Sequence, residues 1–113
     1  MQKVDFREIP GSQGAIWGTE TEDLDATLVR WNPSSGVASH TNAEVDVIMV
    51  VLEGHAIVIV DGQAQELGIG TSLVIPKGVQ RQVIAGSETL TYLNIHKRRR
   101  AMMPNMVRPK NEL

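Results

Sequence analysis

The sequence predicts an all-β domain, and three features of its 113 residues carry this prediction. Glycine and proline recur at short intervals, so the segments between them are too short for ordinary helices. Those segments are rich in β-branched residues, which favour strands. The dipeptide Asp61-Gly62 stands between two strand-like runs, a pattern typical of a tight hairpin. We therefore expect a domain built from short antiparallel strands.

The expected strands follow one another through the middle and the end of the chain. They occupy residues 45–52, 56–60, 72–75, 79–85 and 89–96. The runs at 47–52 and 57–60 are apolar on both faces, so each face has to be covered. One face lines the interior of a barrel or sandwich. A second subunit is the simplest cover for the other face, and we expect a homodimer.

The composition fits one folded domain, which we place at residues 1–97, with an N-terminal strand region included and a basic tail at 98–113. The chain has no cysteine, which excludes disulfides, thiol nucleophiles and thiolate metal sites. Its longest apolar run is far shorter than the roughly 20 residues that span a bilayer, and no signal-peptide pattern is visible. We expect a cytoplasmic protein without a membrane partner.

The charge is divided unevenly along the chain. Residues 1–96 hold five basic and twelve acidic side chains, whereas residues 97–113 hold six and one. An acidic body repels phosphate, and so short a basic tail supplies few contacts to a nucleic acid. Nucleic acid is therefore not the expected partner. The tail is expected to be solvated or to dock on the acidic surface of its own or a neighbouring subunit.

Two blocks within residues 32–83 resemble the motifs of the cupin family of small β-barrels. The first cupin block reads G-x5-H-x-H-x3,4-E-x6-G, and its two glycine and two histidine positions fall on Ser34, Gly54, His40 and Asn42. The second block reads G-x5-P-x-G-x2-H-x3-N, and its first three positions match at Gly70, Pro76 and Gly78. Arg81 and Ala85 stand where that block has its His and Asn. The resemblance implies a cupin double-stranded β-helix, or jelly roll, of six to eight strands that is commonly dimeric.

The resemblance also defines where a metal would be bound. In metal-binding cupins the two His and the Glu of the first block join the His of the second around one cation. Here one of the four ligands remains, His40, and the Glu position falls on Asp46 or on Val47 according to the spacing used. If Asp46 faces inward, it shares one strand face with His40 and Asn42. Because Arg81 brings a permanent positive charge to the fourth position, we expect no metal and no other cofactor.

A guanidinium inside a barrel requires an anion, because an unpaired buried charge is too costly. The anion is either a carboxylate of the chain itself, Asp46 or Glu44, or the carboxylate or phosphate of a small molecule. Both alternatives hold if a ligand displaces the internal partner. In the last predicted strand, Tyr92, Asn94 and His96 share one face and could line the same interior.

We therefore expect a metal-free or metal-degenerate cupin that binds a small anionic metabolite in the barrel lumen. The expected ligand-binding residues are His40, Asn42, Asp46, Arg81, Tyr92 and His96. The alternative is a cupin enzyme, either a metal-dependent oxygenase or isomerase with a rearranged site, or a metal-free isomerase. The metal-free isomerase would use His40 as base and Tyr92 as acid.

Overall fold

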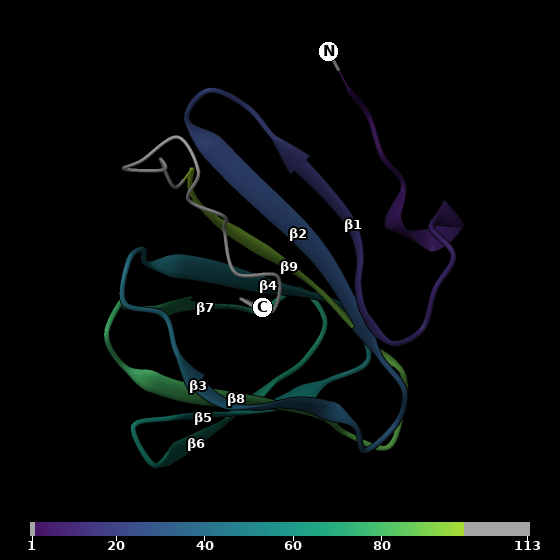
Figure 1. Ribbon diagram of the computed structural model, residues 1–113. Coiled ribbons are helices and arrows are strands. Elements are labelled where there is room, and N and C mark those ends of the chain that lie inside the picture. Colours follow the sequence, from purple (N-terminus) through teal and green to yellow (C-terminus); the bar gives the residue numbers. More distant parts are fainter. Residues whose placement is uncertain (1, 99–113) are drawn as a thin grey trace.

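The computed structural model describes residues 2–98, which form two antiparallel β-sheets facing each other (Figure 1). A 3-10 helix, η1 (Phe6–Glu8), precedes nine strands in this part of the chain. The strands are β1 (Gly14–Glu20), β2 (Leu24–Trp31), β3 (Gly36–Thr41), β4 (Val47–Glu53), β5 (Ala56–Val60), β6 (Gln63–Leu67), β7 (Ser72–Ile75), β8 (Gln80–Ala85) and β9 (Leu90–Lys97). The predicted all-β fold is confirmed. The predicted basic tail, 98–113, lies outside the described residues except for Arg98.

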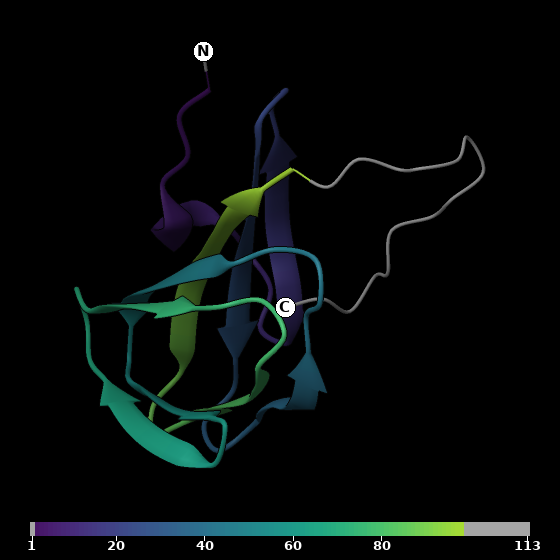
Figure 2. The same cartoon turned by 90° about the vertical axis from the view of Figure 1, so that its left-hand side faces the viewer.

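The two sheets are built from strands that are distant in sequence. The five-stranded sheet has the order β1-β2-β9-β4-β7, and the four-stranded sheet has the order β3-β8-β5-β6. From β2 onward the chain passes repeatedly from one sheet to the other, which produces the two-layered arrangement that Figure 2 shows from the side. This is the jelly-roll architecture expected of a cupin barrel. Within residues 2–98, no helix is long and apolar enough to cross a membrane.

The five predicted strands are confirmed with small shifts at their ends. The strands β5 and β7 have the predicted bounds, β8 and β9 begin one residue late, and β4 begins two residues late. The five expected ranges did not include β1, β2 and β3, although a strand region was expected in the N-terminal part of the domain. The strand β1 pairs with β2 as an antiparallel hairpin at the edge of the larger sheet. This extra edge strand contributes to the count of nine in the described residues, above the six to eight that the resemblance implied.

The predicted hairpin at Asp61-Gly62 is confirmed. The strands β5 and β6 pair up to Val60 and Gln63, so two residues form the turn. Both of these residues have positive φ, 50° for Asp61 and 80° for Gly62. A turn with two positive φ values matches the twist of the strands that flank it, which explains why Asp-Gly is favoured there.

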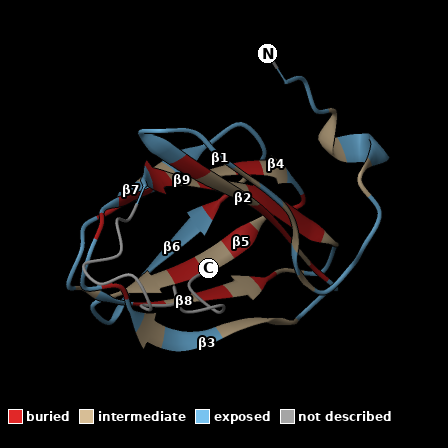
Figure 3. Ribbon diagram, turned by 45° about the horizontal axis from the view of Figure 1, so that its top comes forward, coloured by how far each residue is buried: buried red, intermediate tan, exposed pale blue. Residues whose placement is uncertain are grey.

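The core lies between the two sheets, where the buried residues of both face each other (Figure 3). The larger sheet contributes inward side chains from β2, β4 and β9, and the smaller sheet contributes them from β5 and β8. The central members are Val29, Met49, Val51, Val58, Val83 and Tyr92. Since side chains alternate along a strand, this core fixes which residues of each strand face the interior.

The N-terminal segment, residues 2–11, is bound to the outer face of the larger sheet by one arginine. Arg30 of β2 donates hydrogen bonds to the backbone oxygens of Ile9 (2.6 Å), Phe6 (3.0 Å) and Gly11 (3.1 Å). Its Nε also donates to Oγ1 of Thr91 on the adjacent strand β9 at 2.9 Å. The guanidinium therefore connects the segment to two strands of the sheet.

Replacing Arg30 by Met should release this segment, because three carbonyl groups lose a charged donor at once. We expect the free energy of unfolding to fall by about 1–3 kcal/mol and amide exchange to accelerate in residues 5–11. Hydrogen-exchange mass spectrometry and urea unfolding measure the two effects. Arg7→Met is the matched control, since Arg7 is an exposed residue of the same segment that pairs only with its neighbour Asp5. Equal protection of residues 5–11 in the two variants would contradict the role given to Arg30.

Candidate functional site

Arg81 is buried on the inner face of the smaller sheet. It lies on β8, which has β3 on one side and β5 on the other, and its register partners are His40 and Val60. The residue is 2% exposed, and it alternates with the inward core residues Val83 and Ala85. Arg81 therefore lies in the interior of the barrel, as the sequence predicted. Its role in binding a ligand stays a prediction.

His40 lies beside Arg81, directly across the β3–β8 pairing. The regular register of the two strands breaks between Val37 and His40, so His40 follows an irregularity in β3. Its Nδ1 is 2.9 Å from the backbone oxygen of Ala38. Because a carbonyl oxygen only accepts, this contact is a hydrogen bond that Nδ1 donates. The half-buried imidazole thus lies next to the position of a buried guanidinium.

Tyr92 is buried on the sheet opposite Arg81. It lies on the inner face of β9, is 0% exposed, and its hydroxyl oxygen accepts a hydrogen bond from Nε1 of Trp31 at 3.0 Å. Burial raises the pKa of Tyr92 to about 12, although the Trp31 hydrogen bond and the positive charge of Arg81 act in the opposite direction. The phenol therefore stays protonated over the physiological pH range.

The raised pKa of Tyr92 makes stability depend on pH in the alkaline range. The folded protein holds this proton more tightly than the unfolded chain, so the stabilisation is complete below pH 10 and is lost as the pH rises towards about 12. A shift of this size corresponds to roughly 2–3 kcal/mol. Because Tyr92 is the only tyrosine of the chain, tyrosinate absorbance reports on it alone.

We expect the native absorbance transition near pH 12, and a steeper alkaline loss of stability in the wild type than in Tyr92→Phe. Chemical unfolding at a series of pH values measures that difference. A native transition near pH 10 would show that the hydroxyl is not buried as described.

Asn42 has a structural task in the turn that leads from β3 to β4. Its side-chain oxygen accepts hydrogen bonds from the backbone nitrogens of Glu44 (3.0 Å) and Val45 (3.4 Å), and its backbone oxygen accepts one from Gly78 at 2.7 Å. The residue is 2% exposed. The side-chain carbonyl that was expected to serve a ligand is therefore occupied by the chain, and Asn42 holds the loop beside β3 in place.

Asp46 lies on the outside of the barrel. It is exposed, precedes β4, and its Oδ1 accepts a hydrogen bond from the backbone nitrogen of Lys77 at 2.8 Å. Its neighbour Val47 points inward with 2% exposure. This placement corrects the expectation that Asp46 shares an inward strand face with His40 and Asn42, because a turn separates the two strands and reverses the chain between them.

His96 lies further along the inner face of β9, at its end. It is 8% exposed, its Nδ1 is 2.8 Å from the oxygen of Lys97, and its register partner on β2 is the buried Asp25. His96 and Asp46 both line a pocket of about 480 Å³ at this end of the larger sheet, together with Glu44 and the exposed lysines of that rim. The structure thus divides the predicted site residues into two groups, one around Arg81 and one at the rim.

Two buried polar residues on the inner face of the larger sheet were absent from the expected binding set. Asp25 is 3% exposed on β2, and Asn94 is 5% exposed between Tyr92 and His96 on β9. The sequence placed Asn94 on the polar face of its strand. For Asp25 the sequence signal for an inward side chain was its even spacing from Trp31 on the same strand. That signal is weak, because a carboxylate near a strand end is usually solvated.

The positions at which metal-binding cupins carry ligands do not fit a metal here. They hold His40, Asn42, Val47 and Arg81, of which only the histidine remains suited to a divalent cation. Among residues 2–98, no three His, Asp or Glu side chains gather closely enough to hold one. The donor set in this part of the chain is unsuited to the metal centre of the family.

Comparison with known proteins places residues 27–96 within the sequence profile of a family described as "Cupin domain". Similar solved structures include a cupin-2 domain protein from Shewanella frigidimarina, 25% identical with a TM-score of 0.70 over 84% of this chain and 94% of that one. Protein TT1209 from Thermus thermophilus is 18% identical with a TM-score of 0.76, over 88% and 100% of the two chains. KdgF from Halomonas sp. is 23% identical with a TM-score of 0.68, over 73% and 74%. No curated protein is similar enough to count as a match.

Proposed function

The chain belongs to the cupin domain family, and from that premise we propose that it is a metal-degenerate cupin that binds a small anionic metabolite beside Arg81. The observation that carries the proposal is a guanidinium with 2% exposure on the inner face of the smaller sheet. A guanidinium keeps its charge under all physiological conditions, and its planar set of donors matches a carboxylate or a phosphate. An anion is therefore the ligand that this position favours.

The surroundings of Arg81 support a ligand that combines a negative charge with neutral polar groups. His40 contributes an imidazole at the register position next to Arg81, and the hydroxyl of Tyr92 is buried on the inner face of the opposite sheet. Further along the inner face of β9, Asn94 adds a buried polar group. Asn42 contributes to the site indirectly, because its side chain holds the turn between β3 and β4. Asp46 lines the rim pocket at the end of the larger sheet. The revised binding set consists of Arg81, His40 and Tyr92, with Asn94 further along the inner face of β9, while His96 belongs with Asp46 to the rim pocket.

The position of Arg81 also argues against the metal-dependent alternative. A divalent cation at the family's site would stand a few ångströms from the guanidinium, and like charges repel strongly where water is excluded. A metal-free isomerase is the second candidate, because the imidazole of His40, a side chain suited to proton transfer, is paired with Arg81 across the β3–β8 register. In this reaction Tyr92, on the opposite sheet, is the acid.

We also propose that the protein is a cytoplasmic homodimer. Several outward apolar residues of the larger sheet support the dimer: Leu24, Ile48 and Val74 are 53%, 44% and 63% exposed. A surface patch of this kind is typical of an interface. Sedimentation analysis of the full chain tests the dimer and does not depend on the identity of the ligand.

The experiment that tests the proposed function is a thermal-shift screen with small anions on the full-length protein. Inorganic phosphate, succinate, citrate and pyruvate are the probes, and chloride at equal ionic strength is the control. At least one probe should raise Tm by several degrees at about 100 times its Kd. Metal analysis of protein purified without affinity resin accompanies the screen. Stoichiometric iron, manganese, nickel or zinc, or the absence of any anion-specific shift, would contradict the proposal.

A further inference from the structure

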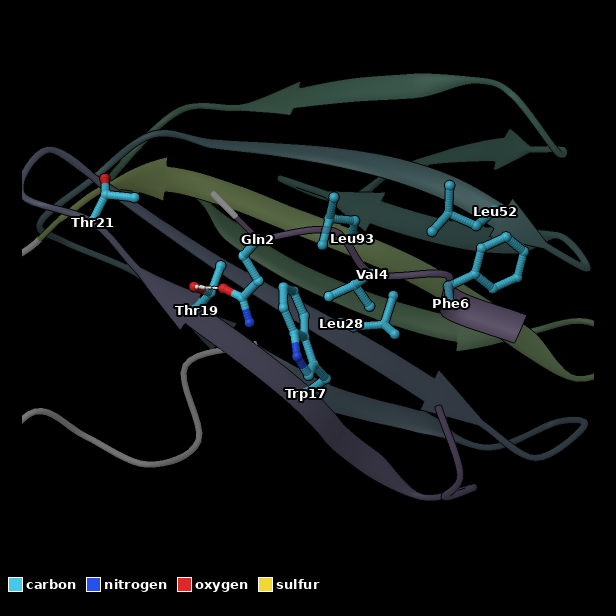
Figure 4. Close-up of a pocket in the computed structure, with 9 residues that line it drawn as sticks. All are labelled: Gln2, Val4, Phe6, Trp17, Thr19, Thr21, Leu28, Leu52 and Leu93. Atoms are coloured by element: carbon cyan, nitrogen blue, oxygen red, sulfur yellow. Dashed lines mark hydrogen bonds between the residues drawn. The ribbon is translucent and has the colours of Figure 1, made fainter. Parts of the chain in front are cut away.

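A second pocket lies on the outer face of the five-stranded sheet, away from Arg81 (Figure 4). Its volume is about 550 Å³, within the range of roughly 300–1,000 Å³ in which proteins bind small molecules. Most of its walls are apolar side chains, namely Val4, Phe6, Trp17, Leu28, Leu52 and Leu93. The pocket is therefore a candidate site that is separate from the interior of the barrel.

The floor of this pocket follows from the register of the sheet. Trp17 of β1 pairs with Leu28 of β2, and Leu28 pairs with Leu93 of β9. Side chains at paired positions point to the same face, so these three form a continuous apolar row across three strands. Leu28 is 2% exposed although it points away from the barrel interior, which shows that this part of the outer face is well covered.

The roof is the N-terminal segment of the same chain. Val4 and Phe6 lie over the sheet, and the Arg30 hydrogen bonds to the backbone of Phe6, Ile9 and Gly11 hold the segment there. At the other end of the roof, Oγ1 of Thr19 is 3.0 Å from Oε1 of Gln2. A single chain thus supplies both roof and floor, and a second copy would have to displace the segment to reach the floor.

The polar groups of the pocket are concentrated at one end. Figure 4 shows Gln2, Thr19 and Thr21 on one side, whereas Phe6 and Leu52 lie on the opposite side. All three polar side chains are neutral, and none of the charged residues between positions 2 and 98 lines the pocket. An ionised ligand would lose its hydration without gaining a counter-charge. The arrangement suits a molecule with an apolar body and one uncharged hydroxyl or carbonyl group.

We propose that this pocket binds a small, uncharged amphipathic molecule, with its apolar body between Phe6 and Leu93 and its polar group towards Gln2 and Thr21. The site proposed beside Arg81 favours a negatively charged ligand, whereas this outer pocket favours an uncharged one. The two sites are separated by the thickness of the sheet, so each can be tested without the other.

The test uses 1-octanol as the probe and octanoate as its charged counterpart, with binding to the full chain followed by calorimetry. We expect saturable binding of 1-octanol and at least about tenfold weaker binding of octanoate. Val4→Phe fills the pocket and should weaken 1-octanol binding by about tenfold or more. Lys3→Phe is the matched control, because it adds the same side chain at the adjacent, exposed position, which does not line the pocket; it should leave binding unchanged.

Tryptophan emission provides an independent readout of location. Trp17 lines the pocket, whereas Trp31 is in the core with its Nε1 bound to Tyr92. Binding of 1-octanol should shift the emission to shorter wavelength, and Trp17→Phe should remove this shift. The proposal is overturned if 1-octanol does not saturate up to its solubility limit, or if Val4→Phe binds it as well as Lys3→Phe. It is equally overturned if dimer formation alone produces the emission shift, since a second copy then occupies the face.

Discussion

Replacing Arg81 by Gln should abolish the rise in Tm that small anions produce in the wild type. Gln removes the charge and the two-pronged donor while keeping a polar side chain of moderate size at a position that is 2% exposed. Charged hydrogen bonds to a buried anion are worth about 2–5 kcal/mol, so we expect the affinity for the best probe to fall by about a hundredfold or more. Titration calorimetry with that probe, chosen from phosphate, succinate, citrate and pyruvate, measures the change.

Two control variants separate the role of Arg81 from a general loss of stability. Arg30→Gln alters the other well-packed arginine of the fold, whose side chain is 12% exposed on the outer face of the larger sheet. This variant should be less stable and should still respond to the anion. Arg81→Lys keeps the charge without the planar donor pair, and we expect intermediate affinity. An undiminished anion response in Arg81→Gln would place the binding site elsewhere.

The second large effect is expected at Gly54, in the turn between β4 and β5. A Cβ added to Gly54 would lie 2.1 Å from the backbone oxygen of Thr89, and the backbone there has a φ of +71°. The obstacle is backbone, so it cannot move aside as a flexible side chain can. We expect Gly54→Ala to reduce the free energy of unfolding by about 3–5 kcal/mol, or to prevent folding. Urea unfolding at constant temperature measures this loss.

Gly62→Ala is the matched control for Gly54→Ala. Gly62 has a comparable φ of +80°, yet nothing lies within 4 Å of an added Cβ. Its variant should lose only about 1–2 kcal/mol, the cost of the left-handed conformation. The difference between the two variants then measures the close approach of the Thr89 backbone. Equal losses of unfolding free energy would mean that the turn at Gly54 relaxes around the added Cβ. Both losses would then come from the left-handed backbone conformation alone.

Much of the fold could be predicted because its signals are local. The bounds of β5 and β7, and the turn at Asp61-Gly62, depend on residues that are adjacent in sequence. The bounds of β1, β2 and β3 were not predicted beyond an N-terminal strand region, and β1, with glycine at positions 14 and 18, has no strong strand pattern. It is a strand because β2 lies beside it and supplies its hydrogen bonds.

The candidate site was predicted less completely, and Asp46 shows why. The two spacings allowed in the first cupin block placed either Asp46 or Val47 at the Glu position, which faces inward. Which of the two residues faces inward depends on a turn that the side chain of Asn42 holds. A shift of one residue in a strand exchanges its inner and outer faces. The amide that holds the turn was itself expected to bind a ligand, because its partners are backbone atoms that a sequence pattern does not reveal.

The sequence by itself determined the all-β class, the cupin blocks and the substitution of an arginine for the second-block histidine, because each depends on residue identity and short-range spacing. The tertiary structure decided that Arg81 is paired with His40, that Tyr92 is buried on the inner face of the other sheet, and that Asp46 lies outside. It also formed the outer pocket, in which Val4 meets Leu93. These contacts join residues tens of positions apart, and they exist only once the two sheets have packed and fixed the register of every strand.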